Sequence, residues 1–172
     1  LILMSDTGGG HSSAAEAIAA AFARDFPERY DVILADGLAR AATPPFNHVA
    51  DWYLPIITYA EAGWGAGFHL TNTPVLEGIA LRLMDAVMAR GMEHLLREQS
   101  PDLVVSMHPL LTTIPHRVLR ALDPRVPFVV VVTDLFDGHR LWFDREADLC
   151  LVPTDGARAV AQRAGMSDEK MQ

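Results

Sequence analysis

The chain has 172 residues, of which 50% are hydrophobic and 21% charged, a composition typical of a globular protein rather than a disordered tail. Its 14 basic and 22 acidic side chains give a formal net charge of −8, which argues against a sequence-independent grip on nucleic acid. The single cysteine, Cys150, excludes a disulfide framework and a thiolate zinc cluster, and it fits a reducing compartment.

The sequence has no segment that fits a transmembrane helix or a signal peptide. Its longest charge-free stretch, residues 62–76, is shorter than a bilayer requires and is interrupted by glycines and by Pro74. The first residues, Leu1-Ile2-Leu3, carry no basic region and are typical of a β-strand that is already under way. We therefore expect the chain to be an excerpt of a longer protein.

Short β-branched runs alternate with longer helical segments, which is typical of parallel strands joined by crossover helices. We expect strands at residues 1–5, 30–35, 102–107, 128–132 and 149–152, and helices at 12–26, 75–98, 114–122 and 155–164. Residues 46–70 are less regular and rich in aromatic side chains. The pattern predicts an α/β fold, a Rossmann-like open parallel sheet with helices on both faces, in one domain over residues 1–172.

Polar side chains follow three of the expected strands. Asp6 and His11 come after the first strand, His108 after the third, and Thr133 with Asp134 after the fourth. Because ligands of open α/β sheets bind beyond the carboxyl ends of the strands, the sequence predicts a functional site at this edge. The imidazole of His108 would contact a ligand there or bridge two loops. The Asp134 carboxylate is placed to orient a histidine or a substrate hydroxyl.

The turn between the first strand and the first helix carries three consecutive glycines, Gly8, Gly9 and Gly10. Glycines let a ligand approach the main chain closely, and the amides that open the next helix favour an anion or a developing oxyanion. Ser12 follows in the same turn and shares the predicted binding site. The alternative is a turn that only packs.

Two nucleotide-binding motifs can be compared with this turn. A P-loop needs a lysine after its last glycine, and the only lysine is Lys170, so that interpretation is excluded. A dinucleotide fingerprint needs glycine where Ser13 stands. Asp36, at the end of the second strand, could still act as the ribose-binding acid, so a dinucleotide-dependent oxidoreductase stays open as an alternative.

His11 lies just before the first turn of the helix that follows the glycines. The helix dipole disfavours the imidazolium there, so we expect a neutral ring that can accept a proton as a general base. A capping or packing histidine is the alternative.

Two apolar features point to a lipid. Residues 46–68 are strongly aromatic, and no lysine or arginine lies between Arg40 and Arg82, which suits burial in a membrane or in the core. The pair Trp142-Phe143 lies in a polar loop, so we expect an exposed platform for a lipid or an acceptor. A non-catalytic lipid-binding module is a further alternative.

Several motifs resemble one known family. They are Leu3-Met4-Ser5-Asp6-Thr7-Gly8-Gly9-Gly10-His11, Val105-Ser106-Met107-His108-Pro109-Leu110, Val131-Val132-Thr133-Asp134-Leu135, His139-Arg140-Leu141-Trp142-Phe143 and Cys150-Leu151-Val152-Pro153-Thr154. In this order they resemble the monogalactosyldiacylglycerol synthase and processive diacylglycerol glucosyltransferase group, over nearly the whole chain.

The resemblance implies the amino-terminal, acceptor-binding lobe of a two-lobed GT-B glycosyltransferase, with the carboxy-terminal donor lobe outside this chain. Such an inverting enzyme moves a hexose from a UDP-sugar to diacylglycerol, uses no metal and no cofactor, and lies peripherally on the cytoplasmic face of a membrane. By resemblance, His11 is the base, the loop Gly8 to Gly10 faces the donor diphosphate, and Trp142 contacts lipid. Ser12 stands where many relatives have arginine.

Overall fold

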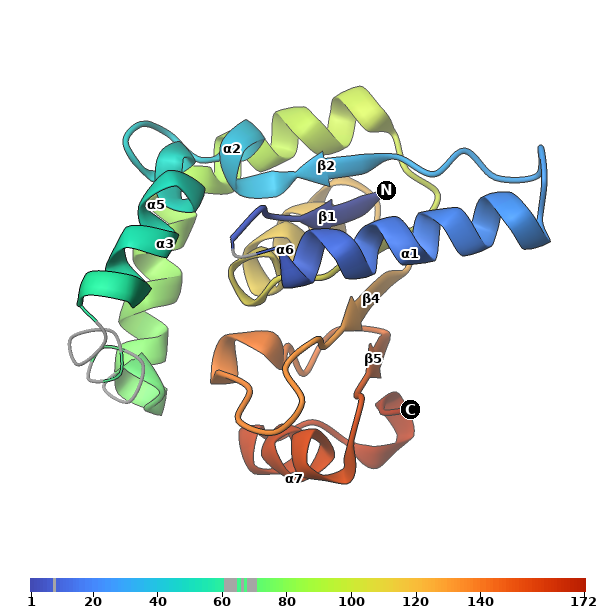
Figure 1. Cartoon of the computed structure of the whole chain (residues 1–172). Coiled ribbons are helices and arrows are strands. Elements are labelled where there is room, and N and C mark those ends of the chain that lie inside the picture. The colour runs from blue at the N-terminus through green and yellow to red at the C-terminus, as the bar shows by residue number, and fades with distance from the viewer. Residues whose placement is uncertain (8, 61–64, 66, 68–70) are drawn as a thin grey trace.

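The structure is a computed structural model that describes residues 1–7, 9–60, 65, 67 and 71–172 (Figure 1). The predictions that concern Gly8 and part of the aromatic stretch, including Trp64 and Phe68, lie outside the described residues. The strands are β1 (Ile2–Met4), β2 (Leu34–Asp36), β3 (Val104–Ser106), β4 (Phe128–Val131) and β5 (Leu149–Leu151). The α-helices are α1 (Gly10–Asp25), α2 (Gly37–Ala41), α3 (Val49–Tyr59), α5 (Pro74–Gln99), α6 (Thr113–Leu122) and α7 (Asp155–Ala164). Short 3₁₀ helices are η1 (Phe46–His48), η2 (Pro109–Leu111), η3 (Arg140–Trp142) and η4 (Asp168–Lys170).

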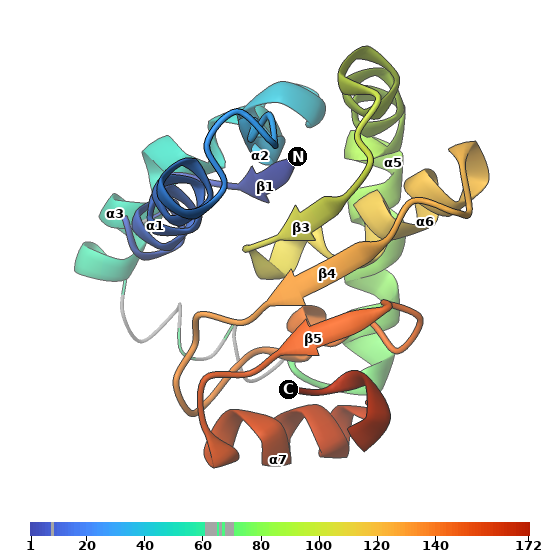
Figure 2. The same cartoon turned by 90° about the vertical axis from the view of Figure 1, so that its right-hand side faces the viewer.

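The five strands form one parallel sheet in the order β2-β1-β3-β4-β5. Leu3 pairs with Ala35 on one side and with Ser106 on the other, which places β1 inside the sheet. The arrows labelled β1, β3, β4 and β5 in Figure 2 accordingly point the same way. The predicted open, Rossmann-like α/β fold is confirmed.

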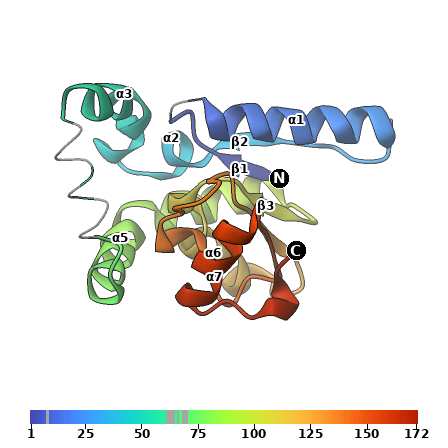
Figure 3. The same cartoon turned by 60° about the horizontal axis from the view of Figure 1, so that its bottom comes forward.

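Helices cover both faces of the sheet (Figure 3). On one face, Ile2 and Met107 pack with Ala15 of α1, whose small side chain allows the helix to lie close to the strands. On the other face, Leu3 and Phe128 belong to the larger core beneath α5 and α6. Successive side chains of β1 thus pack on opposite faces of the sheet, as the two-residue period of a strand requires.

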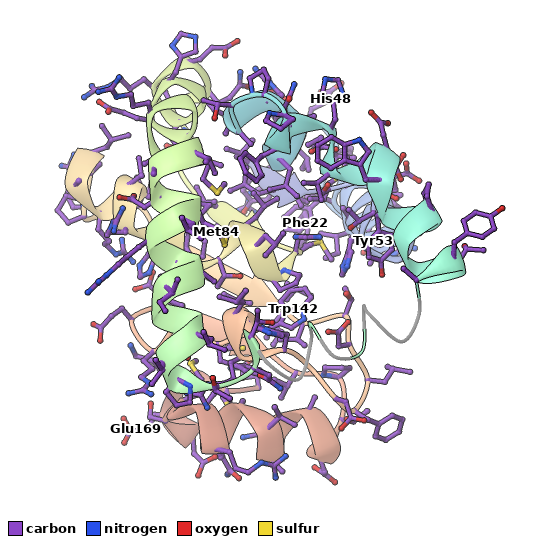
Figure 4. All side chains as sticks on the ribbon, turned by 90° about the vertical axis from the view of Figure 1, so that its left-hand side faces the viewer. Phe22, His48, Tyr53, Met84, Trp142 and Glu169 are labelled. Atoms are coloured by element: carbon purple, nitrogen blue, oxygen red, sulfur yellow. The ribbon has the colours of Figure 1, made fainter. Side chains whose placement is uncertain are left out.

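Helix α5 has two unlike halves (Figure 4). Its carboxy-terminal half is anchored by buried Met88 and Met92, and Gly91 approaches α2 so closely that a Cβ would lie 2.1 Å from the carbonyl oxygen of Ala41. Its amino-terminal half keeps large aliphatic side chains exposed. The carboxy-terminal half is therefore the more deeply buried, while the amino-terminal half packs Leu81 and Met84 against the core and exposes its other aliphatic side chains.

Two sequence expectations need correction. Helix α1 begins at Gly10 rather than Ser12, so His11 lies inside the first turn and not before it. Residues 46–59, expected to be less regular, form η1 and α3. The expected helix at residues 155–164 is confirmed as α7, and Thr154 Oγ1 caps it by accepting from the Ala157 amide at 3.1 Å.

Among the helices in the described part of the chain, none is long and apolar enough to cross a bilayer.

Candidate active site

The carboxyl ends of β1, β3 and β4 bring three predicted side chains together. The rings of His11 and His108 meet edge to face, with centroids 4.7 Å apart and planes at 71°. Thr133 Oγ1 lies 2.8 Å from His11 Nδ1. Residues more than a hundred positions apart in sequence thus lie next to one another at this edge of the sheet.

The half-buried His11 ring has a lowered pKa. Burial is the largest cause, while the negative charge of Asp134 and the carbonyl of Met107 raise the pKa in part. The ring is therefore neutral at physiological pH, as expected from the sequence. The main reason is desolvation of the imidazolium, an effect that the helix position alone did not reveal.

His108 is almost completely buried and bridges two loops. The Leu110 amide donates to its Nδ1 at 3.2 Å, so the neutral ring carries its proton on Nε2, 2.9 Å from Thr7 Oγ1. Thr7 was not singled out from the sequence, although its place in the strand-end turn was a usable signal. The structure thus shows His108 in a loop-bridging arrangement.

Acid should destabilise the fold through His108. Burial, followed by the proximity of His11, lowers its pKa from 6.5 to about 3. Between these values the unfolded chain binds a proton that the folded chain does not, so the free energy of unfolding falls as the pH falls. The stability that the neutral His108 contributes is fully present above about pH 6.5. Below that pH, one such group makes the free energy of unfolding fall by about 1.4 kcal/mol per pH unit. We expect His108→Gln to remove this slope in urea unfolding measured from pH 8 to pH 4.

Measurement of the same variant at pH 8, where wild-type His108 is neutral, isolates the loss of the loop-bridging hydrogen bonds. A slope equal to that of the wild type would contradict the buried, neutral state of this ring.

Trp142 is fully buried, and its indole N–H donates to Asp134 Oδ2 at 2.7 Å. The indole ring lies 5.7 Å from the His11 ring, at 52°. The prediction of an exposed Trp142-Phe143 platform is wrong, since Phe143 is buried as well. The polar loop folds over both rings, and the indole N–H finds its partner inside the molecule.

Asp134 therefore acts on His11 indirectly. Its carboxylate holds the indole that packs beside the imidazole, and its charge raises the pKa of His11. The sequence suggests Asp134 as the side chain that orients His11. In the structure, the side chain that hydrogen-bonds to His11 among the described contacts is Thr133.

The glycine turn leaves the start of α1 open. Gly9 has φ +78°, a left-handed conformation that favours glycine, and no side chain caps the helix. A Cβ on Gly10 would meet no atom within 4 Å. Ser12 Oγ lies 3.3 Å from Asp6 Oδ1 and 3.2 Å from the Gly9 carbonyl oxygen, so Ser12 holds the turn together.

Asp36, the candidate ribose-binding acid, already has two backbone partners. Its Oδ1 accepts from the Ala39 amide at 2.8 Å and caps α2, and its Oδ2 accepts from the Asp6 amide at 3.3 Å. In the described part of the chain, no group of three or more His, Cys, Asp or Glu side chains could hold a metal ion.

Fold and site together define a Rossmann-like α/β domain with a neutral histidine, a glycine turn and an uncapped helix start at the carboxyl edge of its sheet. The family model for monogalactosyldiacylglycerol (MGDG) synthase matches residues 11–172, so the chain belongs to the MGDG synthase family. This membership confirms the resemblance of the motifs and does not favour an oxidoreductase.

Several curated plant proteins are similar to the chain over almost all of its length. Monogalactosyldiacylglycerol synthase 1, chloroplastic, of Arabidopsis thaliana is 33% identical over 99% of this chain, which covers 32% of that protein. The probable synthase 3 of Oryza sativa subsp. japonica is 35% identical over 98%, and covers 33% of its length. Synthase 3 of Arabidopsis thaliana is 36% identical over 99%, with 37% covered. The chain thus spans about a third of these relatives.

Proposed function

We propose that the chain is the acceptor-binding lobe of an inverting glycosyltransferase that moves a hexose from a UDP-hexose to diacylglycerol. The relatives named as monogalactosyldiacylglycerol synthases support this activity. The observation that carries it is the neutral His11 imidazole, held by Thr133 at the sheet edge where a ligand binds. The donor lobe belongs, in this proposal, to the part of the protein outside the chain.

The proposed step uses the two nitrogens of His11 differently. The step requires the tautomer in which Nδ1, 2.8 Å from Thr133 Oγ1, carries the proton and donates to that oxygen, so that Nε2 takes the proton of the diacylglycerol hydroxyl. The hydroxyl oxygen attacks the anomeric carbon as the bond from that carbon to the UDP oxygen breaks, so UDP leaves and the anomeric centre inverts. The Asp134 charge favours the imidazolium that forms.

The open start of α1 has a separate role in the proposal. In the proposal, its amides, which no side chain caps, stabilise the negative charge that develops on the departing diphosphate. The mechanism requires no metal ion and no cofactor from this chain.

Transfer of labelled sugar tests the function directly. Full-length protein is mixed with vesicles containing diacylglycerol and with labelled UDP-glucose or UDP-galactose, and the product is analysed by NMR. We expect a glycosyl diacylglycerol of inverted anomeric configuration, and no product from a diacylglycerol whose free hydroxyl is methylated. Retention of configuration, or an absence of transfer with either donor, would contradict the proposal.

A second part of the proposal is peripheral binding to a membrane, on its cytoplasmic face, through what we call the apolar tip. The tip consists of exposed side chains of η1, α3 and the first half of α5: Phe46, Trp52, Tyr59, Val75, Ile79 and Leu83. Helix α3 and this half of α5 lie at the same end of the molecule (Figures 1 and 3).

The order of side chains along α5 fits insertion into the lipid interface. Val75 and Ile79 are exposed in the first turns, and the first arginine, Arg82, follows on the same helix. An interfacial helix lies along the membrane surface with its apolar face buried about 5–10 Å, and the exposed Arg82 beside that face would then lie near the lipid phosphates.

Removing aromatic side chains from the tip should weaken binding to vesicles. We expect Trp52→Ala with Tyr59→Ser to reduce the fraction bound severalfold in a flotation assay, because these rings supply the apolar area that leaves water. The matched control is Phe26→Ala with Tyr30→Ser, two exposed aromatics at the far end of α1 (Figure 1). Equal losses from the two pairs would contradict the tip as the membrane face.

A further inference from the structure

A cluster of contacts that the proposed mechanism does not use joins η3 to the segment that leads into α5. We call it the η3 latch, and it comprises His139 and Arg140 on one side and Thr71, Asn72 and Glu77 on the other. His139 Nε2 lies 3.1 Å from Thr71 Oγ1, the Arg140 amide donates to Asn72 Oδ1 at 3.0 Å, and Arg140 Nε donates to Glu77 Oε2 at 2.9 Å. The latch therefore connects segments more than sixty residues apart.

The ion pair of the latch is sheltered from water. The side chains of Arg140 and Glu77 are 17% and 20% exposed. On the same helix, the pair Glu93–Arg97 is 47% and 64% exposed. Because water screens a partly buried pair less, the attraction between Arg140 and Glu77 is screened less than the attraction in the exposed pair. It can hold η3 in one position.

Trp142 joins this position to the site. Arg140 begins η3 and Trp142 ends it, and the Trp142 amide donates to the His139 carbonyl at 3.0 Å. The indole of Trp142 then lies beside the His11 ring, with its N–H on Asp134. A shift of η3 would therefore move the Trp142 indole, which packs beside the His11 ring.

We propose that Glu77 and Arg140 are positioning residues for His11, because they fix η3 to α5 and so keep the Trp142 indole packed beside the imidazole. In this proposal, neither residue contacts the substrate. Glu77 lies between Val75 and Ile79, so the latch also ties the site to the helix that carries the apolar tip. For its effect on turnover, this inference rests on the proposed function.

Titration of His11 by NMR in the full-length protein tests the latch without any reaction. We expect Arg140→Met to raise the pKa of His11 towards the ordinary value of histidine, because water reaches the ring once the indole is released. Arg97→Met removes the exposed pair of the same helix and should leave the titration of His11 as in the wild type. His11→Gln identifies the resonance.

Turnover of the full-length protein gives the second readout. We expect Arg140→Met to lower kcat about tenfold with little change in KM, because a misplaced base slows the chemical step rather than binding. Arg140→Lys, which keeps the charge, should recover part of the loss. If Arg140→Met does not fold, Glu77→Gln, which keeps the size and a carbonyl acceptor, carries the same two expectations.

A folded latch variant whose His11 titrates as in the wild type would overturn the inference, and so would an equal change in Arg97→Met. The two proposals can also fail separately. A full-length protein that transfers no hexose removes the proposed function, while the NMR titration still decides whether the latch controls the surroundings of His11.

Discussion

Replacing His11 with alanine should lower kcat of the full-length protein by about 10²-fold or more, the usual contribution of a general base. The reason is that the neutral imidazole, held at Nδ1 by Thr133, is the group assigned to take the proton of the acceptor hydroxyl. Radiolabel transfer from the UDP-hexose to diacylglycerol measures the loss. In the wild type, kcat should fall as the pH drops through the pKa of His11, which burial places below the ordinary value of histidine.

The matched substitution is His94→Ala, on the exposed side of α5. This variant should keep the turnover of the wild type. If His11→Ala turned over nearly as fast as His94→Ala, His11 would have no part in proton transfer, and another acceptor for the proton would be needed.

Replacing Trp142 with alanine should destabilise the chain by about 3–5 kcal/mol, the range for a fully buried aromatic side chain. The loss combines the cavity left by a side chain that is 0% exposed with the removal of the donor to Asp134. Urea unfolding followed by circular dichroism measures it. Trp142→Phe should lose less, since most of the ring volume stays.

Trp52→Ala is the control for this loss, because it removes the same side chain from a position that is 42% exposed. We expect a much smaller decrease in the free energy of unfolding there. Equal decreases in the two variants would show that Trp142 does not pack as the structure has it. The comparison thus distinguishes Trp142, whose buried indole stabilises the fold, from Trp52, whose exposed indole is available to a lipid.

Local sequence patterns predicted the sheet and the edge at which His11, His108 and Thr133 lie together. The apolar runs around Val105 and Val130 are long enough to indicate buried strands, and the polar residues that follow them must meet at one edge of a parallel sheet. The convergence of His11, His108 and Thr133 follows from that topology, and no long-range information was needed to expect it.

Burial in loops could not be predicted in the same way. Trp142 lies among polar residues in sequence, and local polarity suggested exposure, but its neighbours His11 and Asp134 come from other parts of the fold. Likewise, the aromatic residues near Trp52 carried no clear helical signal, although they form α3. For Trp142, the contacts that decide its burial come from residues that a short sequence window does not contain.

The role of Asp36 has a consequence for engineering. Its carboxylate accepts from the amide of Asp6, thirty residues earlier, and Asp6 in turn lies within reach of Ser12. The shape of the first loop is therefore set partly by a neighbouring strand. Transplanting the three-glycine motif into an unrelated α/β scaffold would reproduce its geometry only if the acid at the end of the adjacent strand were transplanted with it.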